Sequence, residues 1–275
     1  MDTHNNGQHT PEAVAGQNGS PRIAAVLAER AKAGRAALVP YVTAGFPQPD
    51  LSLEVLRALV AGGADIIELG VPFSDPAADG PTIQRANDQA LAAGMSLAKV
   101  LALVTEFRRE NTHTPIVLMG YCNPIEAMGL QRFADAAAQA GVDGVLVVDC
   151  PPEEAQDYAA VLRRHRIDLI YLLAPTSTPA RYRLVGEIAR GYVYYVSLKG
   201  VTGAGHLDTD AVARALPAIR ERPGTPSIFP LNPGKSGRVS GRGLGRRPHD
   251  REPGHPRGMR IVTLTTHLDL YHRRR

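Results

Sequence analysis

The 275-residue sequence contains no tryptophan, only two cysteines and 5% aromatic residues. Two cysteines are too few for a disulfide-stapled scaffold or a cysteine-rich zinc site, so a reducing compartment, the cytoplasm, is expected. No apolar run approaches the ~20 residues that cross a bilayer, which argues against a transmembrane chain. The polar segment 1–20 lacks the basic-then-apolar order of a secretory signal, and we predict a disordered leader there.

The net charge of +4 is unevenly distributed along the chain. Residues 226–275 carry ten arginines and Lys235 against three acidic residues, whereas the preceding residues are mildly acidic. A basic segment recognises nucleic acid through a folded surface and a binding motif, and no aromatic residues interleave with these arginines. Nucleic acid is therefore not expected as a partner. The nine histidines are scattered without ligand spacing on a predicted helix, so no metal site is expected either.

Short apolar runs alternate with amphipathic helical segments from residue 21 onward. The runs are almost continuously apolar, as in Val145–Val148, which is typical of parallel strands buried on both faces. We predict strands at 37–42, 65–70, 115–121, 144–149, 168–174 and 192–197. We predict helices at 51–61, 96–110, 130–140, 153–165, 179–190 and 208–220, with one more helix starting at Pro21 behind the N-cap residue Ser20.

Six consecutive βα units fit either a doubly wound sheet or most of an eight-stranded barrel. No Gly-x-Gly-x-x-Gly follows the first strand, which disfavours a dinucleotide-binding sheet. The fold class predicted is therefore α/β, a (β/α)₈ TIM barrel with six clear units. Segment 227–231 is a candidate degraded seventh strand and 261–265 a further strand. With both degraded, we expect an incomplete barrel with an open edge beside strands one and six.

The pattern breaks near residue 225, which divides the chain into three parts. We predict a leader at 1–20, a barrel domain at 21–225 and a basic tail at 226–275 that is dense in glycine, proline and arginine. Such a break indicates a disordered tail, a fused segment or a shifted reading frame. We favour the shifted frame, because misread GC-rich coding sequence is enriched in these three residues.

Four polar residues fall at the carboxyl ends of predicted strands, where barrel proteins build their active sites. They are Glu68, Tyr121, Asp149 and Ser197. Glu68 lies in the apolar run Ile-Ile-Glu-Leu-Gly, and burying a carboxylate there is costly unless something pairs with it or uses it. A structural salt bridge and a catalytic role are both compatible with that position.

The loop after the second predicted strand carries two more acids, Asp75 and Asp79. Together with Glu68, a carboxylate of this loop makes a candidate acid–base pair, because two environments can separate two pKa values. Ordinary turn chemistry at Asp-Pro and Asp-Gly explains the same residues. The glycine-rich segment 199–205 after the sixth strand suits backbone binding of a phosphate, although a loop without a ligand has the same composition.

Two segments, one that begins within the second predicted strand and one in the loop after it, resemble the signature of the tryptophan synthase α subunit family. They are Ile67–Pro76 (IELGVPFSDP) and Ala78–Gln84 (ADGPTIQ). Shorter matches follow the family order along the chain, at 39–45, 119–124, 144–149 and 194–203. The resemblance extends over about residues 21–220.

The resemblance implies a barrel that splits indole-3-glycerol phosphate into indole and glyceraldehyde 3-phosphate, a lyase reaction of L-tryptophan biosynthesis. By motif match Glu68 and Asp79 are the catalytic acids. Tyr121, Asp149, Tyr194 and Gly203 fall at substrate-binding positions, and Asp75 and Asn123 at the contact with a β subunit. The implied assembly is an α₂β₂ heterotetramer, in which pyridoxal phosphate belongs to the β subunit and this chain needs no cofactor.

The sequence departs from the family pattern in its last fifty residues. The family's Gly-Phe-Gly turn after the seventh strand and its Gly-Ser pair after the eighth, which both hold the substrate phosphate, have no counterpart there. Two alternatives to an active lyase therefore stand: an impaired α-like chain that only docks on and activates the β subunit, and another phosphate-binding barrel enzyme such as an isomerase.

Overall fold

Eight parallel strands form a closed barrel in which each strand pairs with its neighbours in chain order. The computed structural model describes residues 19–174, 176–195, 227–230 and 261–265. The strands are β1 (Ala37–Thr43), β2 (Ile67–Gly70), β3 (Ile116–Gly120), β4 (Gly144–Val147), β5 (Asp168–Leu173), β6 (Val193–Tyr195), β7 (Ser227–Pro230) and β8 (Ile261–Thr265).

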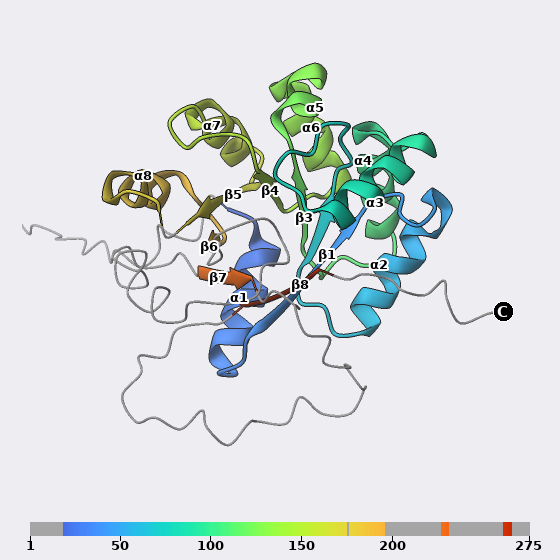
Figure 1. Ribbon diagram of the computed structural model, residues 1–275. Helices are drawn as coiled ribbons and strands as arrows, with labels where there is room; N and C mark the ends of the chain where they lie inside the picture. The colour runs from blue at the N-terminus through green and yellow to red at the C-terminus, as the bar shows by residue number, and fades with distance from the viewer. Residues whose placement is uncertain (1–18, 175, 196–226, 231–260, 266–275) are drawn as a thin grey trace, which may run out of the picture.

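Helices surround this barrel, most of them on its outside and α1 at one end (Figure 1). They are α1 (Pro21–Lys32), the 3₁₀ turn η2 (Pro49–Leu51), α2 (Ser52–Ala61), α3 (Pro81–Ala92), α4 (Leu97–Arg108), α5 (Cys122–Met128), α6 (Leu130–Ala140), α7 (Gln156–Arg164) and α8 (Pro179–Ile188). The (β/α)₈ class is therefore confirmed. The helix predicted at 208–220, the leader up to residue 18 and most of the tail lie outside the described residues, so the three-part division remains a prediction.

The expected open edge beside strands one and six is wrong. β8 pairs with β1 over five positions, from Ala37 opposite Ile261 to Tyr41 opposite Thr265. β7 pairs with β6 through two positions and with β8 through two more. Strand pairing uses backbone groups, which every non-proline residue carries, so a short segment that lacks the family motif can still complete the ladder.

The strand side chains divide into two packed layers because successive residues of a strand point to opposite faces. One layer lies between the strands and the surrounding helices, and includes Leu69, Leu118 and Val145. The other layer fills the barrel interior, and its buried members come from α1 and the strands: Ile23, Leu27, Ala37, Val39, Ile66, Val117, Leu146, Ile170 and Tyr192. This double burial explains why the strand sequences are almost wholly apolar.

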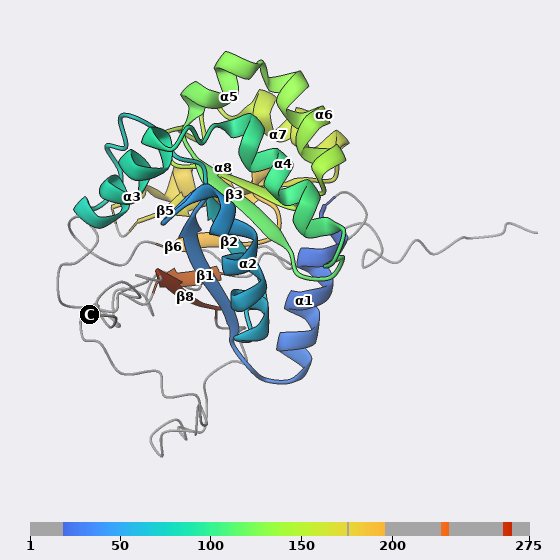
Figure 2. The ribbon, with the colours of Figure 1, turned by 90° about the vertical axis from the view of Figure 1, so that its right-hand side faces the viewer.

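Helix α1 lies across the end of the barrel at which the strands begin, and α3 lies at the opposite end (Figure 2). The predicted start of α1 is confirmed, since Ser20 is its N-cap and accepts a hydrogen bond from the Ile23 N–H at 3.3 Å. Pro21 is its first residue. Ile23 and Leu27 of α1 belong to the interior layer, so this helix covers the end of the barrel at which the strands begin.

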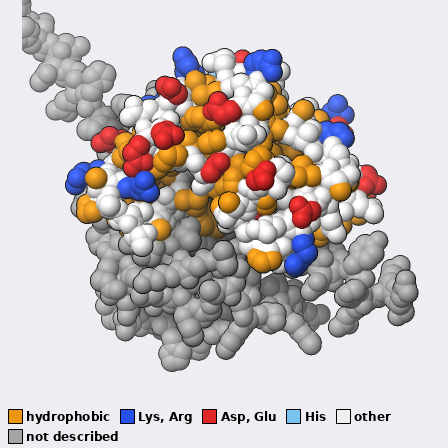
Figure 3. All heavy atoms as spheres, turned by 45° about the horizontal axis from the view of Figure 1, so that its top comes forward, with side chains coloured by type: hydrophobic (Ala, Val, Ile, Leu, Met, Phe, Trp, Pro, Cys, Tyr) orange, Lys and Arg blue, Asp and Glu red, His pale blue; other side chains and the backbone are white. Residues whose placement is uncertain are grey.

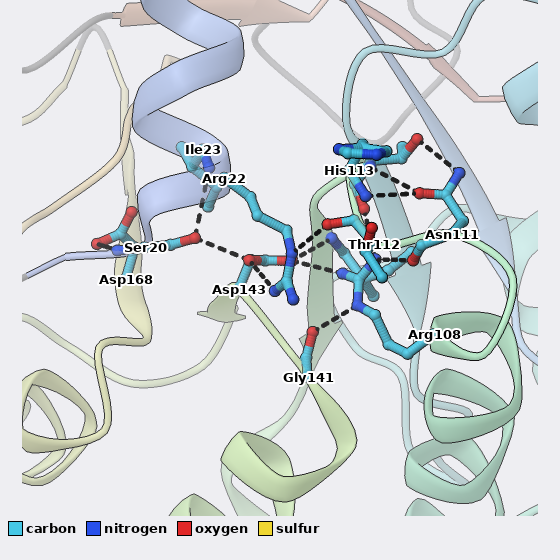
Figure 4. A network of polar contacts seen from close by, with 12 residues as sticks. Ser20, Arg22, Ile23, Arg108, Asn111, Thr112, His113, Gly141, Asp143 and Asp168 are labelled. Atoms are coloured by element: carbon cyan, nitrogen blue, oxygen red, sulfur yellow. Dashed lines mark hydrogen bonds and ion pairs between the residues drawn. The ribbon is translucent and has the colours of Figure 1, made fainter.

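A buried polar network attaches α1 to the strands (Figure 4). At its centre is Asp143, 2% exposed, immediately before β4. Its Oδ1 accepts from the Ser20 hydroxyl at 2.8 Å and from Arg22 at 3.0 Å. Its Oδ2 accepts from Arg108 at 2.6 Å and from the Ile116 N–H at 2.9 Å. One carboxylate therefore connects α1, α4, β3 and β4.

One face of the described part carries both acidic and basic side chains (Figure 3). On the face drawn in Figure 3, acidic and apolar side chains occupy the middle, while lysine and arginine side chains lie nearer the edges. Within the described ranges no single helix is long and apolar enough to cross a membrane. Helices α3 and α4 meet the length and composition criteria only as a pair, with a bend of 92° between them.

Replacing Asp143 with alanine is predicted to destabilise the barrel by about 3–5 kcal/mol, because it leaves the Arg108 guanidinium and several other donors buried without an acceptor. Urea unfolding followed by circular dichroism measures this change. The matched control is Glu110→Ala, which removes the acid of an exposed pair with Arg57 and is predicted to change stability far less. Equal losses in the two variants would contradict the central place of Asp143.

Candidate active site

Glu68 is an acid enclosed within the barrel. It lies on β2 opposite Tyr41 of β1 and Val117 of β3, and only 1% of it is exposed. Its Oε1 accepts a hydrogen bond from the Tyr192 hydroxyl at 2.9 Å. Among the described residues no lysine, arginine or histidine forms an ion pair with it. In that part of the chain Glu68 therefore has no partner for a structural salt bridge.

Burial raises the pKa of Glu68 to about 7, against a partial opposing effect of the Tyr192 hydrogen bond. A carboxyl with this pKa exists in both protonation states near neutral pH, which is the property a general acid–base group needs. Because nothing on the described chain neutralises it with a positive charge, its protonation depends on the dry surroundings.

Asp79 lies in the loop between β2 and α3 and is half-buried. The Tyr121 hydroxyl donates to its Oδ2 at 3.1 Å, and the Asn87 side-chain amide donates to the same oxygen at 3.4 Å. Burial raises the pKa of Asp79, and the two hydrogen bonds partly offset that rise. The loop itself is held by Gln84, whose side chain donates to the backbone carbonyl of Asp79 at 2.9 Å.

The buried hydroxyl of Tyr41 connects the surroundings of the two acids. Burial is the largest cause of its raised pKa, and the negative charges of Asp79 and Glu68 raise it further. Its oxygen also lies 3.3 Å from the Thr43 hydroxyl. Tyr41 therefore lies near both carboxylates, towards the carboxyl ends of β1 and β2.

Tyr121 contacts Asp79 directly, and Asp149 follows the neighbouring strand β4. Tyr121 is 5% exposed, packs its ring against Phe73 at a centroid distance of 5.1 Å, and accepts the Ala78 N–H at 3.1 Å. Asp149 is exposed and its Oδ1 accepts the N–H of Cys122, the first residue of α5, at 2.8 Å. Asp149 also lines a cavity of about 430 Å³ at the ends of β4 and β5.

The other binding and interface residues predicted from the sequence are Tyr194, Gly203, Asp75 and Asn123. Tyr194 of β6 packs with the interior layer beside Tyr192. Asp75 and Asn123 are exposed, as an interface role requires. Gly203 and the glycine-rich segment around it lie outside the described residues. Within the described part, no group of three or more histidine, cysteine or acidic side chains could hold a metal ion.

Three side chains around the acids had no role in the sequence interpretation: Tyr41, Asn87 and Tyr192. Two of them had a detectable signal, because Tyr192 lies two residues before Tyr194 and Tyr41 lies in a predicted buried strand, so period-two alternation turns both inward. Asn87 had none, since its contact with Asp79 depends on how α3 packs.

The fold and these acids define a class of protein: a (β/α)₈ barrel with two partly desolvated carboxylates at the ends of its strands. A profile of the family described as tryptophan synthase alpha chain matches residues 27–229. The chain belongs to the tryptophan synthase alpha chain family, which has a lyase role. This confirms the family to which the sequence motifs pointed.

Relatives and solved structures agree with this membership. The tryptophan synthase alpha chain of Laribacter hongkongensis is 60% identical over 200 residues, which cover 73% of this chain and 76% of that protein. That of Dechloromonas aromatica is 63% identical over 193 residues, covering 70% and 72%. The crystal structure of the subunit alpha from Legionella pneumophila has a TM-score of 0.71 at 40% identity, covering 76% of this chain and 78% of that one. A Mycobacterium tuberculosis tryptophan synthase chain has a TM-score of 0.73 at 32% identity, covering 89% and 88%.

The close packing of Tyr41 leads to a prediction about Gly70. A β-carbon on Gly70 would lie 2.7 Å from Cζ of Tyr41 and closer still to its hydroxyl. We expect Gly70→Ala to cost about 1–3 kcal/mol of stability through overpacking. In a double-mutant cycle measured by urea unfolding, Tyr41→Phe is expected to make Gly70→Ala less damaging, because it removes the nearest atom. Additive losses would contradict this contact.

Proposed function

We propose that this chain cleaves indole-3-glycerol phosphate into indole and glyceraldehyde 3-phosphate, as a retro-aldol lyase of L-tryptophan biosynthesis. The observation that carries the proposal is the enclosed Glu68, which has no described cation beside it, together with Asp79 in the loop that follows the same strand. Family membership supports the substrate. Both acids lie in the described part of the chain. Neither the docking-only alternative nor the isomerase alternative is needed to explain their presence.

The reaction needs a sink for the electrons of the breaking carbon–carbon bond. A proton delivered to C3 of the indole ring creates that sink, while a carboxylate that accepts the ring N–H stabilises the positive charge on the ring. A base then takes the proton of the side-chain hydroxyl next to the breaking bond, the bond electrons return to the ring, and an aldehyde and indole result. The protein therefore needs one acid–base group and one group that stays charged.

Glu68 suits the first role and Asp79 the second. With a pKa raised to about 7, Glu68 has a proton to give at neutral pH and, once it is ionised, can accept the hydroxyl proton. Asp79 receives two hydrogen bonds on Oδ2 that favour its ionised form. Tyr121, Asp149, Tyr194 and Gly203 are proposed to bind the substrate, the glycine through its backbone N–H at the phosphate.

A second part of the proposal concerns the partner. The indole would pass to a tryptophan synthase β subunit, in an α₂β₂ assembly in the cytoplasm, and the pyridoxal phosphate would belong to that subunit. Asp75 and Asn123 are proposed as contacts, because both are exposed and both follow strands at their carboxyl ends, Asp75 in the loop after β2 and Asn123 in the first turn of α5 after β3. A solved relative from Mycobacterium tuberculosis is described as tryptophan synthase.

Glu68→Gln and Asp79→Asn are each predicted to lower the rate of indole release by at least roughly a hundredfold, since general acid–base groups contribute typically 10²–10⁴-fold. The measurement is indole formation from indole-3-glycerol phosphate, with and without a β subunit. In the unsubstituted chain kcat/KM should fall as the pH rises above about 7, because Glu68 must begin protonated. Glu68→Gln with unchanged indole release would contradict the proposal.

Glu68→Gln, which should lower activity, is predicted to raise stability at alkaline pH. Because its pKa in the folded chain is about 7 and its ordinary value is 4.5, folded Glu68 retains a proton that the unfolded chain has lost between those pH values. Stability therefore falls as the pH rises through this window, by the order of 3 kcal/mol in all. Glu68→Gln should be more stable than the unsubstituted chain at pH 8.5 and equal to it near pH 4.5, as measured by urea unfolding.

The partner contact is tested by Asp75→Lys. We expect weaker association with a β subunit, measured by calorimetry, and less stimulation of indole release when the β subunit is added. Indole release by the isolated chain should stay within twofold, since Asp75 is exposed and its described side-chain contact is with Ser74. Glu110→Ala is the matched control, an exposed acid elsewhere on the barrel. Unchanged association in Asp75→Lys would remove this residue from the interface.

A further inference from the structure

Asn87 is a polar side chain buried where an apolar one would be expected. It lies on α3 in the middle of the buried face that also contains Ala86 and Ala90, and it is 2% exposed. Its carbonyl oxygen Oδ1 is buried and has no hydrogen-bond partner among the residues that the structure describes. An unpaired buried carbonyl destabilises the fold, and an apolar side chain of similar size would avoid that penalty. A buried polar atom of this kind calls for an explanation beyond packing.

The amide group of Asn87 supplies that explanation. Its Nδ2 donates to Oδ2 of Asp79 at 3.4 Å, on the same oxygen that receives the Tyr121 hydroxyl at 3.1 Å. Two donors from different elements, one from α3 and one from the end of β3, therefore converge on a single carboxylate oxygen. The other oxygen, Oδ1, receives no hydrogen bond from any described residue.

We infer that Asn87 is a positioning residue of the proposed lyase: it holds Asp79 by Oδ2, so that Oδ1 is left to accept the N–H of the indole ring. This inference rests on the proposed function and extends it to a residue without sequence signal. Asn87 does not touch the substrate in this account. It fixes the rotation of the carboxylate and supports its charged form, as a donor to an anion does.

The opposing interpretation is that Asn87 only holds the loop to α3. Gln84 offers a matched comparison, because it lies on the same helix and donates to the same residue, but to the backbone carbonyl of Asp79. If holding the loop is the whole effect, variants at Gln84 and Asn87 should behave alike. If the carboxylate is the target, only Asn87 variants should change the titration of Asp79 and the recognition of the N–H.

The test uses the complete chain with a β subunit and the variants Asn87→Leu, Asn87→Asp and Gln84→Ala. We expect Asn87→Leu to lower kcat/KM for indole-3-glycerol phosphate roughly tenfold, the effect of one hydrogen bond to a charged group. The acid limb of the pH profile should move upward in Asn87→Leu, and further in Asn87→Asp, which places a second negative charge beside Asp79. In Gln84→Ala the limb should stay in place.

Binding of indole and of 1-methylindole gives a readout that does not depend on turnover. The unsubstituted chain should prefer indole, which has the N–H, and Asn87→Leu should lose most of that preference, whereas Gln84→Ala should keep it. If Asn87→Leu does not show a cooperative thermal transition, Asn87→Ala takes its place in both measurements.

An unmoved acid limb together with an unchanged indole preference in the Asn87 variants would overturn the inference. Failure of the proposed function is recognised separately, because either the unsubstituted chain would then release no indole or Glu68→Gln and Asp79→Asn would retain full indole release. If these two variants lose activity while the Asn87 variants behave like Gln84→Ala, the lyase stands and Asn87 has only a structural role.

Discussion

Closure of the barrel imposes one constraint from which the rest follows: every second strand residue must point into the same enclosed space. Most positions in that space hold apolar side chains, such as Leu146 and Ile170, which pack without polar atoms to satisfy. Glu68 occupies one of these inward positions and is only 1% exposed. Its raised pKa is a consequence of this burial, which the hydrogen bond from Tyr192 offsets only in part.

The two ends of the barrel use buried carboxylates in opposite ways. At the end where the strands begin, Asp143 is saturated with donors from α1, α4 and β3, so its charge is satisfied and it holds elements together. At the other end, the described residues give Glu68 one neutral donor and Asp79 two, so these acids hold far fewer donors than Asp143 does. All strands of a barrel run parallel, so its two rims differ, and the proposed chemistry lies at the rim where the strands end.

Several features were correctly predicted from residue patterns. The continuous apolar runs indicated strands buried on both faces, the Ser20-Pro21 pair indicated the start of α1, and the motif around Glu68 indicated the family. The open edge was predicted wrongly, because composition reports side chains and strand pairing uses the backbone. The Asp143 network was missed, since its donors come from positions as far apart as Ser20 and Arg108.

Local order along the chain was enough to place Glu68 and Asp79 in their strand and loop, because a buried run and a turn are properties of consecutive residues. It was not enough to show which oxygen of Asp79 is occupied, what surrounds Glu68, or why Asn87 is polar. Those facts depend on contacts between α3, β1, β3 and β6, which meet only after the barrel closes. Hydrogen-bond geometry and desolvation act through space, and a linear pattern carries neither.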